Sequence, residues 1–167
     1  MKSYFFIPAS HLSKIGAIKK SAPDVIIIDF EDAILGTDIE VFFNELSSLE
    51  DVSSYWYRIP VRNNFEEDLT LEYIKKFKDI GVKFMILPKI KSITELIKIT
   101  DTFKDVKFIL LIEHPRLLLE IESAIMQYPA LLKSLVAIGM GSHDLMTFLN
   151  AKHTKEQLDY PRKKMLY

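Results

Sequence analysis

The sequence predicts an α/β protein whose strands run parallel to one another. Short runs rich in Ile, Val and Phe alternate with longer stretches of helical periodicity, which is the pattern of repeated βαβ units. Several short runs are apolar at consecutive positions, as in VIIID at 25–29 and FILLI at 108–112, and this is typical of strands covered on both faces. No linker or low-complexity tract interrupts the alternation, so we expect a single domain over residues 1–167.

The expected elements can be placed along the chain from these runs. Six strands are expected, at residues 4–8, 25–30, 55–59, 84–87, 107–112 and 136–139. Helices are expected at residues 12–20, 39–49, 69–80, 93–103 and 117–126, with a last one from residue 155 into the C-terminus. Ser92, with Glu95 three residues later, matches a capping box at the start of one helix. Gly81 suits the left-handed position that follows the end of another helix.

The composition argues against nucleic acids and membranes as partners of the protein. Lys and Arg number 22 against 23 Asp and Glu, a net charge of -1, so there is no broad basic field for nucleic acid or an anionic membrane. There is no cysteine, which excludes disulfides and thiolate metal ligands and is compatible with a cytoplasmic protein. No apolar stretch reaches the roughly 20 residues that a membrane span requires. The N-terminal segment is expected to be a strand and not a signal peptide.

Ionisable residues gather where the expected strands end. In a parallel α/β barrel or open sheet, that edge is where active sites are built. Any one of these residues alone would more often be a solvated loop charge, so the convergence is what predicts a site. The residues that share this position are Asp29, Glu31, Asp32, Arg58, Lys89, Glu113 and Asp144.

Glu113 and Asp144 are the candidate metal ligands. Glu113 directly follows the apolar run FILLI, so its carboxylate should be partly dehydrated and should need a cation, a donor or a proton. Asp144 follows the next strand, and two carboxylates with waters and a substrate are the usual arrangement around Mg²⁺. The alternative for Asp144 is that it caps a helix beginning near Leu145.

Six segments, in order along the chain, resemble the citrate lyase beta subunit and its HpcH/HpaI aldolase/citrate lyase family, which includes malyl-CoA lyases. They are KSYFFIPAS, IIIDFEDAI, YRIP, ILPKI, IEHP and GSHDL, and together they span most of the chain. The resemblance implies a (β/α)8-barrel of the TIM type, of which this chain supplies about six βα units as an incomplete or open barrel. The last two strands of the family's barrel are expected to be missing.

The resemblance also implies roles for the strand-end residues. Glu113 and Asp144 would bind Mg²⁺. Arg58 would bind the carboxylate or oxyanion of an α-keto acid, a task that suits guanidinium geometry. Arg62, four residues further on, is a second candidate for substrate binding, and either arginine could instead make a surface ion pair.

Three further residues complete the candidate site. The resemblance implies that Glu31 and Asp32 are catalytic residues with Arg58, holding metal-bound waters or orienting ligands; the alternative for both is a loop cap. Lys89 is a candidate substrate-binding cation. A Schiff-base role for Lys89 is not required, because the metal and an arginine would stabilise the charge that develops.

His114 and His143 lie immediately beside the two candidate metal ligands. In these positions the resembled family more commonly has a small hydroxyl residue and an acid. The two histidines could add imidazole ligands and favour a transition metal over Mg²⁺. The alternative is that both are partly buried loop residues.

The function that the resemblance implies is a Mg²⁺-dependent carbon-carbon lyase. It would cleave a short hydroxyacyl thioester, carried by CoA or an acyl carrier protein, to an acyl thioester and an α-keto acid. A homo-oligomer is expected. Two alternatives stay open: a catalytically degraded scaffold or assembly module of the same fold, and a class II aldolase acting on a free hydroxy-keto acid.

Overall fold

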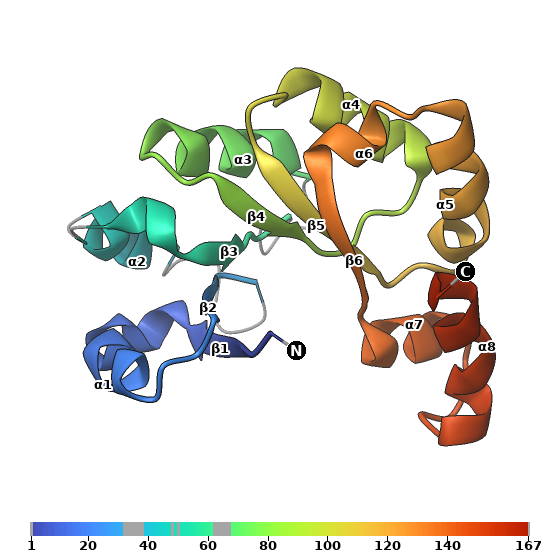
Figure 1. The fold of residues 1–167 in the computed structure, drawn as a ribbon, viewed down its shortest axis with the longest axis horizontal. Coiled ribbons are helices and arrows are strands. Elements are labelled where there is room, and N and C mark those ends of the chain that lie inside the picture. The colour runs from blue at the N-terminus through green and yellow to red at the C-terminus, as the bar shows by residue number, and fades with distance from the viewer. Residues whose placement is uncertain (1, 32–38, 48, 50, 62–67, 167) are drawn as a thin grey trace. The chain divides into compact units, whose positions relative to one another are not determined.

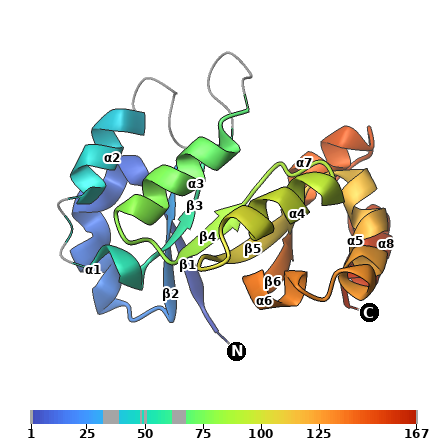
Figure 2. The ribbon, with the colours of Figure 1, turned by 90° about the horizontal axis from the view of Figure 1, so that it is seen from above.

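The computed structural model describes residues 2–31, 39–47, 49, 51–61 and 68–166, and its ribbon is shown in Figures 1 and 2. The chain divides into two compact units, Met1–Ile86 and Leu87–Tyr167, and each is described by itself. The expectation of a single domain stays a prediction. Asp32 and Arg62, two of the candidate site residues, lie outside the described residues.

The first unit is built on four parallel strands that lie side by side in sequence order. The strands are β1 (Tyr4–Pro8), β2 (Val25–Asp29), β3 (Trp56–Arg58) and β4 (Phe84–Leu87). Between them lie the 3-10 helices η1 (Ala9–Lys14) and η2 (Val52–Ser54) and the helices α1 (Ile15–Lys20), α2 (Ile39–Ser47) and α3 (Thr70–Asp79). The register places Asp29 and Arg58 opposite each other, at the carboxyl ends of β2 and β3.

Phe77 is at the centre of the core of the first unit. It has no exposed surface, and its ring lies 5.0 Å from Phe30, 5.3 Å from Phe43 and 5.6 Å from Tyr57, between ring centroids. The contacts with Phe30 and Phe43 are edge-to-face, the geometry that aromatic quadrupoles favour. The contact between Phe43 and Phe77 joins α2 to α3, which lie side by side in Figure 2.

Asp24 joins the starts of β1 and β2. Its Oδ2 accepts hydrogen bonds from the Ser3 N–H at 2.7 Å and the Ser3 hydroxyl at 2.8 Å, and these donors hold the pKa of Asp24 below its ordinary value of 3.8. A carboxyl whose pKa is lowered in the folded state stabilises the fold above its unfolded pKa. That contribution is lost as the pH falls through the folded pKa.

Asp24→Asn is therefore expected to lower the midpoint of urea unfolding at neutral pH. The difference from the wild-type protein should shrink as the pH falls below about 4, because wild-type Asp24 then also becomes neutral. Urea titrations at a series of pH values, followed by circular dichroism, measure this difference. A difference that stays constant from neutral pH to well below 3.8 would contradict the role given to this carboxylate.

The second unit contains two parallel strands, β5 (Lys107–Ile112) and β6 (Leu135–Met140). Its helices are α4 (Ile93–Thr102), α5 (Pro115–Gln127), α6 (Leu131–Ser134), α7 (Ser142–Phe148) and α8 (Lys155–Leu166). An ion pair between Lys164 and Glu122 joins α8 to α5. Among the described residues, no helix combines the length and the apolar character needed to cross a membrane.

The elements agree closely with the sequence prediction. All six expected strands are present, and β1, β4 and β5 have the predicted bounds. Ser92 caps α4, its Oγ accepting the Glu95 N–H at 3.3 Å, although the Glu95 carboxylate reaches the N–H of Lys91 instead of that of Ser92. Gly81 has a φ of +95°, as expected after the end of α3.

The short helix α6 was not predicted, and a helix near Leu145 was expected only in the alternative for Asp144. The alternative role of Asp144 as the cap of a helix near Leu145 is wrong, because α7 begins at Ser142 and Asp144 lies inside its first turn. The residue that precedes the helix is Gly141, which has no side chain to cap it. The absence of a capping side chain is why the sequence did not reveal this helix start.

Candidate active site

Arg58 and Asp29 form a bidentate ion pair in the first unit. Arg58 Nε donates to Asp29 Oδ1 at 2.8 Å, and Nη2 donates to Oδ2 at 2.5 Å. The two residues are opposite each other in the register of β2 and β3, so the strands themselves bring the side chains together. Parallel guanidinium and carboxylate forks of this kind combine charge with fixed orientation.

Glu31 provides a second carboxylate for the same guanidinium. Its Oε2 lies 2.9 Å from Arg58 Nη1, and its backbone N–H donates to Asp29 Oδ1 at 3.0 Å. The aromatic ring of Phe6, on β1, lies 5.7 Å from the Arg58 Cζ. The Asp29, Glu31 and Arg58 side chains are only 10%, 5% and 15% exposed. The cluster therefore holds two carboxylates and one guanidinium in a largely dehydrated place.

Glu113 is the buried carboxylate of the second unit. It follows β5 directly and is 2% exposed. Its Oε2 accepts the backbone N–H of Lys89 at 2.6 Å. Lys89 follows Pro88 and has a φ of +54°, a left-handed conformation that is uncommon for a residue with a side chain. This unusual backbone conformation accompanies the direct contact between the Lys89 N–H and the carboxylate.

The backbone of Gly141 approaches the same Glu113 side chain closely. A Cβ atom built on Gly141 would lie 2.2 Å from Glu113 Cγ and 2.3 Å from Oε1, closer than real contacts allow. The backbone of Gly141 also donates to the Ile112 carbonyl at 3.1 Å. Glu113 thus lies in a cradle made by the Lys89 backbone and a position where only glycine fits.

Asp144 is the second candidate ligand, and its position is compatible with a shared metal site. Glu113 follows β5 and Asp144 lies in the first turn of α7 after β6, and these two strands pair in parallel. Among the residues that the structure describes, no group of three or more His, Cys, Asp or Glu could hold an ion. Two carboxylates completed by waters and substrate oxygens are, however, the set that Mg²⁺ commonly takes. A buried carboxylate fits this hard cation chemically.

The two histidines beside these residues make other contacts. His114 caps α5, its Nδ1 accepting the Arg116 N–H at 3.2 Å. The His143 ring stacks on His153 with centroids 4.1 Å apart, and His153 Nε2 lies 2.8 Å from Ser142 Oγ. The cap engages one ring nitrogen of His114, and the stacking places the ring of His143 against that of His153.

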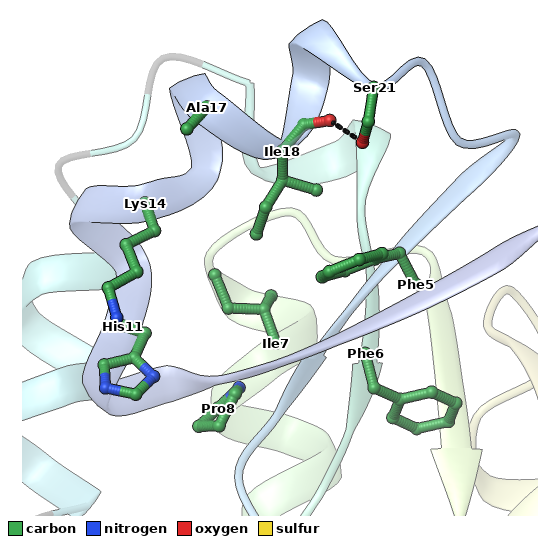
Figure 3. A pocket seen from close by; sticks show the side chains of 9 residues that line it. All are labelled: Phe5, Phe6, Ile7, Pro8, His11, Lys14, Ala17, Ile18 and Ser21. Carbon is green, nitrogen blue, oxygen red and sulfur yellow. Dashed lines mark hydrogen bonds between the residues drawn. The ribbon is translucent and has the colours of Figure 1, made fainter.

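A hollow of about 490 Å³ runs along β1 and the helices that follow it. Its lining is mostly apolar, with His11 and Lys14 together at one end (Figure 3). Phe5 and Phe6 point to opposite sides of the strand, and Phe6 is also the residue whose ring faces Arg58. The hollow has a different chemistry from the carboxylate and guanidinium cluster.

Sequence reasoning placed the ionisable residues but missed their supports. It brought Glu31 and Arg58 to one strand edge, and the structure joins them directly and adds Asp29 to the same guanidinium. Asp29 had a signal, since it ends the strand VIIID at the predicted edge. There was no sequence signal for the contact of the Lys89 N–H or for the close approach of Gly141. Both depend on the path of the backbone, which residue types alone do not specify.

Parallel βα units with acidic and guanidinium groups at the carboxyl ends of their strands are typical of α/β enzymes, whose active sites are built at this edge of the sheet. The matching family model is described as HpcH/HpaI aldolase/citrate lyase, and it covers residues 2–164. The chain belongs to the HpcH/HpaI aldolase/citrate lyase family. This membership confirms the predicted resemblance and places the chain in a family of lyase-type enzymes.

Solved structures confirm the fold. The protein CitE from Mycobacterium tuberculosis, in complex with magnesium and acetoacetate, has a TM-score of 0.75 at 19% identity, over 99% of this chain and 67% of that one. The CitE complex with magnesium, acetoacetate and coenzyme A has a TM-score of 0.74 at 20% identity, over 99% and 60%. A citrate lyase from Burkholderia xenovorans LB400 gives 0.71 at 15%, over 98% and 58%. A comparison with curated proteins returns no significant match.

Proposed function

We propose that the protein is a Mg²⁺-dependent carbon-carbon lyase that cleaves a short hydroxyacyl thioester to an acyl thioester and an α-keto acid. The observation that carries the proposal is the buried Glu113 carboxylate, 2% exposed and held by the Lys89 N–H. Burying a carboxylate is costly unless a cation or donors stabilise it. The deep burial of the carboxylate and the close approach of Gly141 to it support a metal ligand at this position.

The chain's own residues would divide the chemistry between them. Glu113 and Asp144 would hold Mg²⁺, which when bound would stabilise negative charge on a substrate oxygen. Arg58, kept in orientation by Asp29, would bind the carboxylate of the keto acid. Glu31 would be the adjacent carboxylate that orients ligands at the guanidinium.

Three more residues keep proposed roles beside this arrangement. Asp32 would act with Glu31 in orienting ligands, and Arg62 would be a second arginine for the substrate. Lys89 would add a cation on the substrate side, in addition to the backbone contact with Glu113. Preorganised charge of this kind is usually the largest contribution to catalysis.

The ligands of the solved relatives support the substrate class. CitE has been crystallised with magnesium and pyruvate, with magnesium and acetoacetate, and with magnesium, acetoacetate and coenzyme A. By analogy we propose an α-keto acid and a thioester of CoA or an acyl carrier protein as the small-molecule partners. We also propose a homo-oligomer, supported by the exposed aromatic residues Tyr4, Phe5 and Phe6 on β1; light scattering would measure its mass.

Glu113→Gln is the variant that tests the metal site. It keeps the size of the side chain and removes its charge, so Mg²⁺-dependent binding of oxaloacetate should fall at least about tenfold, as measured by calorimetry with and without Mg²⁺. Glu120→Gln is the matched control, because Glu120 is on α5 of the same unit and pairs with Arg116. Equal affinity in the wild type and both variants would refute the site.

Cleavage assays distinguish the proposed thioester lyase from an aldolase that acts on a free hydroxy-keto acid. Citryl-CoA and malyl-CoA should be cleaved with Mg²⁺, and a free hydroxy-keto acid should not. Cleavage of the free acid alone would identify a class II aldolase.

A non-catalytic scaffold is the second candidate function. One observation favours it: all three nitrogens of the Arg58 guanidinium are already engaged by Asp29 and Glu31. A scaffold of this kind would keep its fold and its ion pairs but bind no keto acid, so the same calorimetric titration distinguishes it from a lyase.

A further inference from the structure

The hollow beside β1 is bounded by the strand and by the helix that follows it. Phe5 and Ile7 are two residues apart on β1, so their side chains lie on the same face of the strand, and Figure 3 shows them between the strand and α1. Ala17 and Ile18 line the hollow from α1. Its volume of about 490 Å³ is within the range of small-molecule sites. The hollow is therefore large enough for a ligand, and its lining lies wholly in the first unit.

The apolar surface of the hollow is only partly covered by the protein. Ile7 is 2% exposed, but Phe5 is 44% exposed, and Ala17 is exposed on α1. The contact of such surface with water is unfavourable, and a ligand gains binding free energy in proportion to the apolar area that it covers. The hollow therefore favours a ligand with an apolar body.

One end of the hollow is cationic. Lys14 and His11 lie together there, and the Lys14 side chain extends toward the His11 ring (Figure 3). Neither side chain forms an ion pair or a side-chain hydrogen bond with the residues that the structure describes, and none of the described lining residues is acidic. Lysine supplies one positive charge and imidazole can supply an N–H donor. This end of the hollow therefore suits one carboxylate.

We propose that the hollow is a binding site for an apolar monocarboxylate of the medium-chain fatty acid type. The carboxylate pairs with Lys14 and accepts a hydrogen bond from His11, and the alkyl chain lies between β1 and α1 toward Phe5. The proposal is carried by the match between a hollow with charge at one end and apolar walls, and a ligand built in the same way. The site is separate from the function proposed above, since neither Arg58 nor Glu113 lines it.

Three eight-carbon probes separate the contribution of the charge from that of the apolar body. Octanoate is expected to bind with one molecule per chain, about fivefold or more tighter than octanol, because octanol has no charge to pair with Lys14. Octylamine should bind more weakly than either, because its cation would meet the lysine. Shortening octanoate should weaken binding by roughly two- to fourfold for each CH₂ removed. Calorimetric titration of the full chain at neutral pH without Mg²⁺ measures these affinities.

Lys14→Met tests the cationic end, because methionine keeps an unbranched side chain and removes the charge. The affinity for octanoate should fall about fivefold, and the affinity for octanol should not change. Lys14→Arg keeps the charge and should keep most of the octanoate affinity. Lys20→Met is the matched control, since Lys20 is also exposed on α1 and does not line the hollow.

Ala17→Phe tests the hollow itself. Because Ala17 is exposed on α1 and lines the hollow, a larger side chain there should fill the space without disturbing the core. The affinities for octanoate and for octanol should both fall at least about tenfold. Urea unfolding of each variant shows whether a change in affinity follows a loss of fold.

Three outcomes overturn the proposal. One is equal affinity of the wild type for octanoate and octanol, which would make the hollow a purely apolar surface. Another is octanoate binding that neither Lys14→Met nor Ala17→Phe weakens, which would place the ligand elsewhere. The third is the absence of octanoate binding; a mass above that of one chain in light scattering, lowered by Ala17→Phe, would then identify a second copy as the occupant.

The site and the proposed lyase function fail independently. Octanoate should bind Glu113→Gln as tightly as it binds the wild type, because Glu113 does not line the hollow. Loss of thioester cleavage or of Mg²⁺-dependent oxaloacetate binding would therefore leave the octanoate titration unchanged.

Discussion

Gly141→Ala is expected to remove most Mg²⁺-dependent keto acid binding and to destabilise the second unit. The added Cβ would lie 2.2 Å from Glu113 Cγ, 2.3 Å from Oε1 and 2.7 Å from Cδ. Glu113 cannot yield freely, since it is 2% exposed and its Oε2 is bonded to the Lys89 N–H. Displacing the carboxylate should lower metal affinity roughly 10- to 100-fold, and overpacking of this kind costs about 1–3 kcal/mol of unfolding free energy.

Gly139→Ala is the matched control for this variant. A Cβ on Gly139 would lie 2.9 Å from Leu111 Cδ2, the far end of a flexible side chain, so a small rotation relieves the contact. Gly141 has a φ of -83°, which alanine adopts readily, so backbone conformation does not explain a difference between the two variants. Calorimetry with Mg²⁺ and oxaloacetate measures both. Full affinity in Gly141→Ala would show that the cradle around Glu113 is not needed.

Phe77→Ala is expected to have the largest effect on the stability of the first unit. The ring has no exposed surface and contacts Phe30, Phe43 and Tyr57, so its removal leaves a cavity bounded by three aromatic side chains. Truncations of this kind cost about 3–5 kcal/mol, a large part of the 5–15 kcal/mol by which a typical domain is stable. The effect should appear as a lower urea midpoint.

The single tryptophan provides the probe for that measurement. Trp56 is in the same unit and stacks on Phe84 with centroids 5.2 Å apart, so its fluorescence reports on β3 and β4. Val41→Ala is the control, because Val41 is 54% exposed on α2 and its truncation should change the unfolding free energy by less than about 0.5 kcal/mol. A loss below about 1 kcal/mol in Phe77→Ala would mean that the core collapses around the missing ring.

The strands could be predicted because the information for them is local. Consecutive apolar residues such as those of VIIID at 25–29 are required where both faces of a strand are covered, and the structure forms β2 there, ending at Asp29. The start of the helix α7 could not be predicted. The helix is seven residues long, too short for a clear period, and it is preceded by a glycine instead of a capping side chain.

The candidate site could be predicted only at the level of the strand ends. Parallel strands bring their carboxyl ends to one edge, and this placed Arg58 and Glu31 together. The bidentate partner of Arg58 depends on the register of β2 and β3, which requires tertiary structure. The hold on Glu113 depends on a backbone amide, and every residue except proline has one. The identity of residue 89 therefore does not reveal this hydrogen bond.

The contact between the Lys89 N–H and Glu113 has a consequence for how the family's sequences diverge. Because the donor is a main-chain amide in a left-handed residue, the contact itself does not depend on which side chain occupies position 89. Glycine and asparagine adopt that backbone conformation most easily, and proline alone removes the amide. A support for the proposed metal ligand can thus be inherited while the residue that provides it changes, so the conformation of the loop can be retained when its sequence is not.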